Sequence, residues 1–384
     1  MKILIVKTVS KGLDKKITYN VQGIGLGTEL VRLGHQVALV YFAEDGKDRT
    51  QTIAVDDKEL LIYHISGKEF LKSALYNHKL YELCEEYDII QASEYDQYTT
   101  WNIYKHFPQK TIIYHGPYNS EYTKKHNYYV RVFDTFFLNR KHYKDAHVIT
   151  KSKLAERYLR NKGFRNVKTL GVGFNPEYID INCEESSIPI VVKNLKNAKN
   201  NSKYLLYVGA ISERKNVKFL LEIVHALKEK NEKVVLLIVG KINIENQYYK
   251  ECVKYIDNKK LKSNVIFCGQ IEQKYLKHFY QMADVFLLPT QYDIYGMVYL
   301  EAMYFGVPVV TTLCGGSSTL MEDGKSGYIR KIGDISGWCE AIEKILTDTV
   351  AKDKMAEEEQ KIIKEKYLWS KLVYEFEKEY RKLL

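Results

Sequence analysis

The sequence lacks any run of about 18 apolar residues, the length that a helix needs to cross the hydrocarbon layer of a membrane. We therefore expect no transmembrane helix. The six cysteines show neither CxxC spacing nor a Cys/His pattern of metal ligands. Reduced, mostly buried thiols in a cytoplasmic protein are the preferred interpretation. The apolar start, residues 1–6, is too short and too early for a signal peptide and predicts a buried first strand.

Positive charge is concentrated in one part of the chain. The 384 residues carry a net charge of +10. Residues 97–170 alone hold 15 lysine and arginine side chains against 4 acidic ones, together with many aromatic residues. A composition of 45% hydrophobic and 28% charged residues is typical of a folded protein, and the length predicts about two domains.

Short apolar runs alternate with longer amphipathic segments, which predicts parallel sheets with right-handed crossovers. The expected strands are 2–6, 36–41, 53–63, 89–92, 111–115, 147–150, 167–170, 204–208, 234–239, 265–267, 285–288 and 307–311. The expected helices include 23–33, 217–229, 273–282 and 298–304. The alternation restarts after the polar stretch 193–203, the best linker candidate. We therefore predict an α/β fold with two Rossmann-like domains, 1–195 and 203–367, facing across a cleft. A C-terminal helix, 368–384, should pack back on the first domain.

Three glycines at the first expected helix form a GxGxG pattern: Gly23, Gly25 and Gly27. Dinucleotide binding is disfavoured, because it requires GxGxxG directly after the first strand and here about 16 residues intervene. The alternative is a flexible loop at a helix N-terminus that meets a phosphate or an acceptor hydroxyl. Gly34 is expected to cap the end of this helix.

A histidine, His115, ends one expected strand. The carboxyl end of a parallel strand lies at the ligand edge of the sheet, which favours a functional role. A hydrogen-bonded edge histidine without such a role is the alternative.

The segment 121–144 places apolar residues at helical spacing among basic ones. It is interpreted as an amphipathic core helix with a solvated face, or as a surface for anionic lipid headgroups or a lipid-diphosphate acceptor. No nucleic-acid recognition motif is present, so nucleic acid is not an expected partner.

Two cations and two carboxylates stand near helix starts in the second half of the chain. Arg214 and Lys215 follow a strand and suit a diphosphate leaving group. Asp293 and Glu301 lie eight residues apart with a glycine between them, and their carboxylates can accept hydrogen bonds from sugar hydroxyls. The turn 315–318, Gly-Gly-Ser-Ser, is either a second phosphate-binding turn or a plain β–α turn.

Taken together, these residues resemble glycosyltransferase family 4, the retaining glycosyl transferases group 1 with the GT-B fold. The resemblance covers nearly the whole chain and is densest from 204 to 329. Its ordered motifs are Tyr-Val-Gly209, Arg214-Lys215, Ile-Val-Gly240, Phe-Cys-Gly269, Leu-Pro289, Asp293…Glu301-Ala-Met, Gly306-Val-Pro308, Gly315-Gly316 and Asp323-Gly324-Lys-Ser-Gly327.

The resemblance implies a nucleotide-sugar donor bound mainly by the second domain, without a metal or other cofactor. Asp293 would contact the donor sugar, Glu301 would accept hydrogen bonds from the ribose, and His115 would lie beside the reacting sugar. The diphosphate would meet Arg214, Lys215 and the helix start at Gly296, Met297 and Val298. The nucleotide would lie against Gly209, Gly240, Gln270 and Ile271. Gly23, Gly25 and Gly27 would belong to the acceptor side of the cleft.

The sequence departs from the family pattern at three positions. Asp293 stands where glutamate is usual, so its carboxylate reaches about one methylene less far. Ala210 replaces a common arginine, and Thr319 replaces a common glutamate. The departure at Asp293 bears on donor choice, and Ala210 and Asp293 together keep open the alternative of a catalytically silent GT-B partner subunit. A GT-B nucleotide-sugar epimerase is a further alternative.

The expected function is transfer of a sugar from a UDP- or GDP-sugar to a saccharide or lipid-linked acceptor in bacterial cell-surface glycan synthesis. The expected location is the cytoplasm, with peripheral binding to an anionic membrane surface as a further hypothesis.

Overall fold

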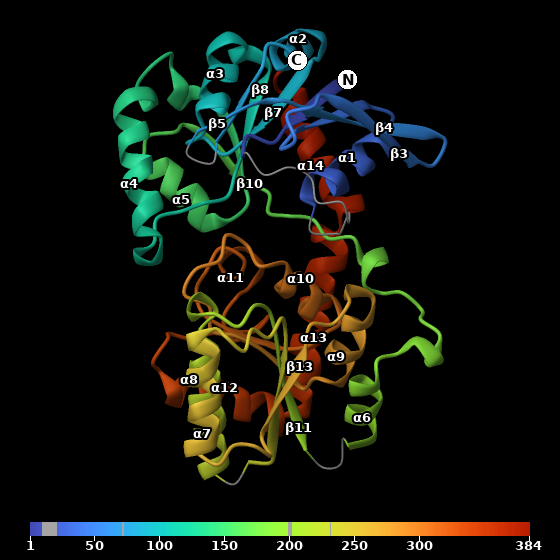
Figure 1. Cartoon of the computed structure of the whole chain (residues 1–384), viewed down its shortest axis with the longest axis vertical. Helices are drawn as coiled ribbons and strands as arrows, with labels where there is room; N and C mark the ends of the chain where they lie inside the picture. The colour runs from blue at the N-terminus through green and yellow to red at the C-terminus, as the bar shows by residue number, and fades with distance from the viewer. Residues whose placement is uncertain (10–20, 71–72, 199–201, 231) are drawn as a thin grey trace. The chain divides into compact units, whose positions relative to one another are not determined.

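The structure, a computed structural model, describes residues 1–9, 21–70, 73–198, 202–230 and 232–384 (Figure 1). The chain forms two compact units. The first consists of Met1–Asn175 and Tyr367–Leu384, and the second of Pro176–Lys366. The boundary between the two units therefore lies between residues 175 and 176, before the expected linker at 193–203. Part of that linker is helix α6 (Ile190–Ala198) of the second unit, and 199–201 lie outside the described residues.

An eight-stranded sheet forms the centre of the first unit, with the strand order β10-β9-β8-β7-β1-β2-β4-β3 in the described residues. Its strands are β1 (Lys2–Val6), β2 (Gln36–Phe42), β3 (Arg49–Val55), β4 (Lys58–Ile65), β7 (Ile89–Ser93), β8 (Thr111–His115), β9 (His147–Thr150) and β10 (Asn166–Thr169). A separate antiparallel pair contains β5 (Gly67–Phe70) and β6 (Ser73–Tyr76). The helices are α1 (Gln22–Arg32), α2 (Lys79–Glu86), α3 (Tyr98–His106), α4 (Lys124–Phe133), α5 (Lys153–Asn161) and α14 (Trp369–Arg381).

The single strand expected at 53–63 is wrong, because two strands occupy this region. β3 and β4 form an antiparallel hairpin, while the other pairings in this sheet are parallel. The reversal takes place at Asp56, whose φ of 54° is left-handed, a conformation that aspartate tolerates better than most residues. Four charged residues in succession, 56–59, mark this turn in the sequence.

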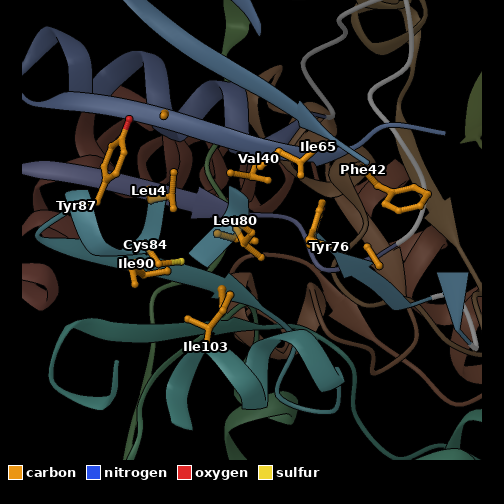
Figure 2. Packing of buried hydrophobic residues seen from close by; sticks show 14 residues of the cluster. Leu4, Val40, Phe42, Ile65, Tyr76, Leu80, Cys84, Tyr87, Ile90 and Ile103 are labelled. Atoms are coloured by element: carbon orange, nitrogen blue, oxygen red, sulfur yellow. The ribbon is translucent and has the colours of Figure 1, made fainter. Parts of the chain in front are cut away.

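Apolar side chains from the middle of this sheet meet α2 and α3 (Figure 2). Leu4 of β1 and Ile90 of β7 lie in one buried cluster with Leu80 of α2 and Ile103 of α3. Burying such a side chain is worth about 1.5–3 kcal/mol, so this cluster fixes the strands whose carboxyl ends carry the polar residues discussed below.

Helix α1 contains the three glycines that were expected in a loop, so the loop interpretation is wrong. α1 ends as predicted: Gly34 has a φ of 91°, its N–H donates to Val31 O, and the N–H of His35 donates to Leu30 O. Gly25 and Gly27 serve close packing. A Cβ atom on Gly25 would lie 2.5 Å from the indole nitrogen of Trp369, and one on Gly27 3.0 Å from Leu60. α14, drawn in red in Figure 1, packs against α1 through this contact.

We expect Gly25→Ala to destabilise the protein by about 1–3 kcal/mol, because the added methyl group overlaps the Trp369 ring in a packed core. Gly23→Ala is the matched control on the same helix. Its Cβ would meet the Tyr41 hydroxyl at 3.2 Å and Lys7 Cε at 3.9 Å, both at the ends of side chains, and alanine favours the helix by up to about 1 kcal/mol. Urea unfolding measures both variants, and equal stability of the two would contradict the packing role of Gly25.

The second unit is built on a six-stranded sheet, in the described residues, whose pairings are all parallel, with the order β13-β12-β11-β14-β15-β16. Its strands are β11 (Lys203–Val208), β12 (Val234–Val239), β13 (Val265–Gly269), β14 (Val285–Leu288), β15 (Val309–Thr311) and β16 (Tyr328–Ile329). Besides α6, its helices are α7 (Val217–Glu229), α8 (Gln247–Asn258), α9 (Leu276–Met282), α10 (Met297–Tyr304), α11 (Ser317–Leu320), α12 (Ile335–Thr347) and α13 (Thr349–Ile362). The strand series predicted from 204 onward is found here, apart from shifts at the strand ends.

Candidate active site

The predicted donor residues follow the carboxyl ends of neighbouring strands in the second unit. Gly209 follows β11, Gly240 follows β12, Gln270 follows β13, and Asp293 lies beyond β14. Carboxyl ends of adjacent parallel strands meet at one edge of the sheet, where ligands bind in open α/β folds. The sheet order therefore gathers residues that are up to 84 positions apart in the sequence, from Gly209 to Asp293.

Two cations meet the Asp293 carboxylate at this edge. Lys215 lies in a one-turn 3₁₀ helix after β11, and its ammonium group donates a hydrogen bond to Asp293 Oδ2. The guanidinium of Arg214 donates to the backbone oxygen of Tyr292 at 2.7 Å and lies 4.0 Å from the same carboxylate. Lys215 is only 9% exposed, so its charge acts in a medium of low polarity, where electrostatic interactions are strong. The structure thus brings together all three residues, although their roles toward a donor stay predictions.

Glycines at the start of α10 and in the turn 315–318 allow close packing of the loop that precedes α10. Gly296 precedes the helix with a φ of 82°. A Cβ on Gly315 would lie 1.8 Å from Ile294 O, and one on Gly316 1.9 Å from Tyr295 O. Both glycines are therefore required for backbone packing against the Asp293 loop. Phosphate binding by this turn remains a prediction, as does diphosphate binding by Met297 and Val298 at the start of α10.

Glu301 lies in the middle of α10 and is fully buried. The hydroxyl of Tyr280 donates to its Oε2 at 2.6 Å, while Oε1 has no hydrogen-bond partner among the described residues. Burial raises the pKa of this carboxyl from 4.5 to about 8. An unpartnered buried oxygen is costly and can accept a hydrogen bond from a ligand hydroxyl. Tyr280, on α9, was missed in the sequence, where it appears only as one aromatic residue of an amphipathic helix.

The residues predicted to lie against the nucleotide are at the ends of β11, β12 and β13. A Cβ on Gly240 would lie 1.9 Å from Gly209 O, so only glycine lets these two turns approach. Gln270 is exposed and Ile271 half-buried, directly after the left-handed Gly269. Contact with a base stays a prediction for all of them.

The first unit holds its own polar cluster around His115. This residue ends β8, is fully buried, and places Nδ1 2.9 Å from Glu94 Oε2. The other carboxylate oxygen of Glu94 accepts from Lys151 Nζ at 2.7 Å. Burial alone would raise the pKa of Glu94, but Lys151 and His115 hold it well below its ordinary value. Glu94 and Lys151 were not predicted, although each directly follows a strand that neighbours β8, namely β7 and β9.

Metal ligands were not expected. In the part of the chain that the structure describes, no three His, Cys, Asp or Glu side chains are grouped so that they could hold a metal ion. Donor binding without a metal stays a prediction.

Residues 192–367 match the family model described as glycosyl transferases group 1. The N-acetyl-alpha-D-glucosaminyl L-malate synthase of Bacillus anthracis is 29% identical over 129 residues, 34% of this chain and 33% of that protein. An uncharacterized glycosyltransferase of Methanocaldococcus jannaschii is 25% identical over 241 residues, 61% of this chain and 59% of that protein. The matches thus span from about a third to three fifths of these relatives.

The crystal structure of Anabaena HepE in complex with UDP-glucose is similar over the full length of both chains, with a TM-score of 0.69 and 18% identity. This similarity concerns the fold. Residues 192–367, most of the second unit, are therefore similar to the glycosyl transferases group 1, and the chain has the GT-B fold.

Proposed function

We propose that the protein is a hexosyltransferase that moves a sugar from a nucleotide-diphosphate sugar to a saccharide or lipid-linked acceptor. The observation that carries this proposal is the buried Lys215, held with Arg214 against Asp293 at the ligand edge of the family-matched unit. A buried cation beside a second, half-exposed one suits a diphosphate that gains charge as it leaves. The complex of HepE with UDP-glucose supports a donor of this class.

The reaction proposed is a transfer with retention of configuration. The donor diphosphate takes the place of the Asp293 carboxylate beside the Lys215 ammonium group. Asp293 then accepts hydrogen bonds from the hydroxyls of the donor sugar. Glu301 Oε1 accepts a hydrogen bond from the ribose. The leaving phosphate then assists deprotonation of the acceptor on the same face of the sugar, so no carboxylate nucleophile is required, in contrast to retaining hydrolases. No metal is required in this scheme, because Lys215, Arg214 and the N-terminus of α10 face the diphosphate.

Two other functions are kept as alternatives. Ala210 and Asp293 depart from the family pattern and motivate a catalytically silent partner subunit. A nucleotide-sugar epimerase would use the same donor site. The silent subunit would neither transfer nor hydrolyse a donor, and the epimerase would convert the donor without an acceptor.

A panel of UDP-, GDP- and ADP-sugars in a thermal-shift assay tests the donor site. We expect one nucleotide class to raise the melting temperature, because a ligand at about 100 times its Kd stabilises the folded state by about 2.7 kcal/mol. The same compound should not stabilise Lys215→Ala. If no member of the panel shifts the transition, and no sugar is transferred or released, the proposed function is wrong.

A basic aromatic surface on α4 and the residues that follow it, up to Lys141, supports an anionic membrane as the second partner. The buried side of the segment packs as the core-helix interpretation predicted, through Val130, Phe133 and Leu138. Three apolar side chains spaced four residues apart point outward instead: Tyr128, Val132 and Phe136 are 71%, 42% and 54% exposed. Exposed cations flank them, namely Lys124, Lys125, Arg131, Arg140 and Lys141. Apolar side chains between cations are typical of helices that bind at the surface of anionic bilayers.

We expect the protein to co-sediment with vesicles that contain anionic phosphatidylserine and to be released by salt. The triple change of Lys124, Lys125 and Arg131 to glutamine should weaken binding about 100-fold, because each cation near such a surface is worth about 1 kcal/mol. The matched control replaces Lys228, Lys254 and Lys262 of the second unit in the same way. Equal binding of the two triple variants, or no binding at low salt, would contradict the membrane hypothesis. In the described residues no helix is long and apolar enough to cross a bilayer.

A further inference from the structure

Four neighbouring strands of the first unit each end in a charged or titratable residue. In sheet order these are Lys151 after β9, His115 at the end of β8, Glu94 after β7, and Lys7 after β1. The backbone N–H of Lys151 donates to His115 O at 2.8 Å, which fixes the two strand ends against each other. The sheet therefore places one carboxylate between a histidine and two lysines at its ligand edge.

Glu94 is placed by an unusual backbone conformation. Its φ of 57° is left-handed, which costs a residue with a side chain about 1–2 kcal/mol. This conformation lets one carboxylate reach three groups: Lys151 Nζ at 2.7 Å, the Gly116 N–H at 2.8 Å, and His115 Nδ1 at 2.9 Å. The Glu94 side chain is 13% exposed and that of Lys151 8%. A strained backbone conformation of this kind persists where the surrounding contacts hold the residue in place.

The two ring nitrogens of His115 have different surroundings: Nδ1 lies beside this carboxylate, and the buried Nε2 contacts no hydrogen-bond partner among the described residues. Nδ1 forms no directed hydrogen bond within the described part of the chain but lies 2.9 Å from Glu94 Oε2, so the negative charge attracts a proton on Nδ1 and repels a lone pair there. The ring of Tyr95 packs edge-on at 5.0 Å, and that of Tyr158 stacks at 6.2 Å. The charged or titratable groups around the imidazole are Glu94, Tyr95, Asp96, Lys151 and Tyr158, with Lys7 beyond Glu94 and His126 beyond Asp96.

We propose that Glu94 and Lys151 are positioning residues for His115: the carboxylate keeps the proton of the neutral imidazole on Nδ1, and the ammonium keeps that carboxylate ionised. The Nε2 lone pair is then free to accept a hydrogen bond from a hydroxyl of the reacting sugar. A carboxylate that selects the tautomer of a histidine in this way can change a rate by several orders of magnitude when it is replaced by an amide. The use of Nε2 rests on the proposed function, whereas the tautomer does not.

Nitrogen NMR of the ¹⁵N-histidine-labelled full chain tests the tautomer directly. The signal of His115 is assigned by its loss in His115→Gln. We expect a protonated Nδ1 and an unprotonated Nε2 in the wild type near pH 7.5, and a mixture of tautomers in Glu94→Gln. Lys151→Met should also give a mixture of tautomers, whereas Lys151→Arg, which keeps the positive charge, should give the wild-type spectrum. An unchanged His115 signal in both Glu94→Gln and Lys151→Met would overturn the proposal.

A double-mutant cycle tests the consequence for transfer. We expect Glu94→Gln to lower kcat about tenfold or more with little change in KM for the donor, and to have no further effect in a His115→Ala background. Glu379→Gln is the control, because Glu379 is a 7% exposed carboxylate of the same unit that also pairs with two lysines. Additive effects of the two changes would overturn the positioning role. If the wild type binds no donor, the proposed function fails, while the tautomer measurement still decides the inference.

Discussion

Replacement of Lys215 by alanine should lower kcat/KM for sugar transfer by about 10²–10³-fold. Removing one preorganised electrostatic group from a site of developing charge has an effect of this size. Lys215 is the more buried of the two cations at Asp293, since its side chain is 11% exposed and that of Arg214 40%. It is therefore less screened by water, and we expect the loss in Arg214→Ala to be smaller.

The control for this experiment is Lys262→Ala. Lys262 also pairs with an aspartate, Asp257 at 3.0 Å, but its side chain is 80% exposed. An exposed pair contributes at most about 1 kcal/mol to stability, so this variant should keep full activity. A Lys215→Ala protein that folds and retains activity within about threefold of the wild type would remove the main argument for the donor site.

Replacement of Glu301 by glutamine should stabilise the folded protein at neutral and alkaline pH. In the unfolded chain this carboxyl ionises near 4.5, but in the folded state it keeps its proton up to about pH 8 because it is buried. Between these values the folded state binds more protons, so the free energy of unfolding of the wild type falls as the pH rises. The loss is about 1.4 kcal/mol per pH unit and reaches on the order of 4 kcal/mol at pH 8. Glutamine does not titrate, so the free energy of unfolding of Glu301→Gln does not show this loss as the pH rises.

Thermal unfolding of the wild type and Glu301→Gln from pH 5 to pH 8 measures this difference, which should widen with pH. A constant difference would show that Glu301 ionises normally. Donor binding should move in the opposite direction, because the amide nitrogen cannot accept a hydrogen bond from the ribose as the carboxyl oxygen that it replaces can. We expect donor affinity to fall about 2- to 10-fold, the size of one hydrogen bond between neutral groups.

Glu359 provides a matched control for Glu301. It is also fully buried in the second unit, burial raises its pKa well above the ordinary value, and its Oε1 accepts from the Val309 N–H at 3.1 Å. Glu359→Gln should therefore show the same trend of stability with pH without any change in donor affinity. Loss of donor binding in both variants would mean that Glu301 acts only through the fold.

The strands of both sheets could be predicted well, because buried parallel strands are short apolar runs between amphipathic helices. The hairpin β3–β4 was missed because its two-residue turn, Asp56–Asp57, is short enough for the two strands to be taken as one, although four charged residues in succession, 56–59, mark the turn. The boundary between the units was misplaced for another reason. The polar stretch after residue 193 begins within helix α6, whose buried Val192 and Leu195 are spaced for one face. Polar composition alone did not distinguish a helix with a solvated face from a linker.

The candidate site was partly visible in the sequence. Lys215, Asp293 and Glu301 stood out because they follow a known order of motifs. Glu94 and Tyr280 did not, because their roles depend on contacts with residues 57 and 21 positions away, Lys151 and Glu301. The spacing of apolar residues in 121–144 did not show which of them face the core, and Val132 and Phe136 are exposed.

The first unit is completed by a segment of chain that follows the whole of the second unit. Trp369 packs against Gly25 and Gly173, and the backbone of Phe174 pairs with that of Tyr367 and Trp369. At about 5–20 residues per second, a ribosome needs roughly 10–40 s to make the intervening segment. During translation the second unit can therefore fold before the first is complete. Until Trp369 is made, the apolar surface that it covers in the first unit is exposed, and a chaperone can bind there.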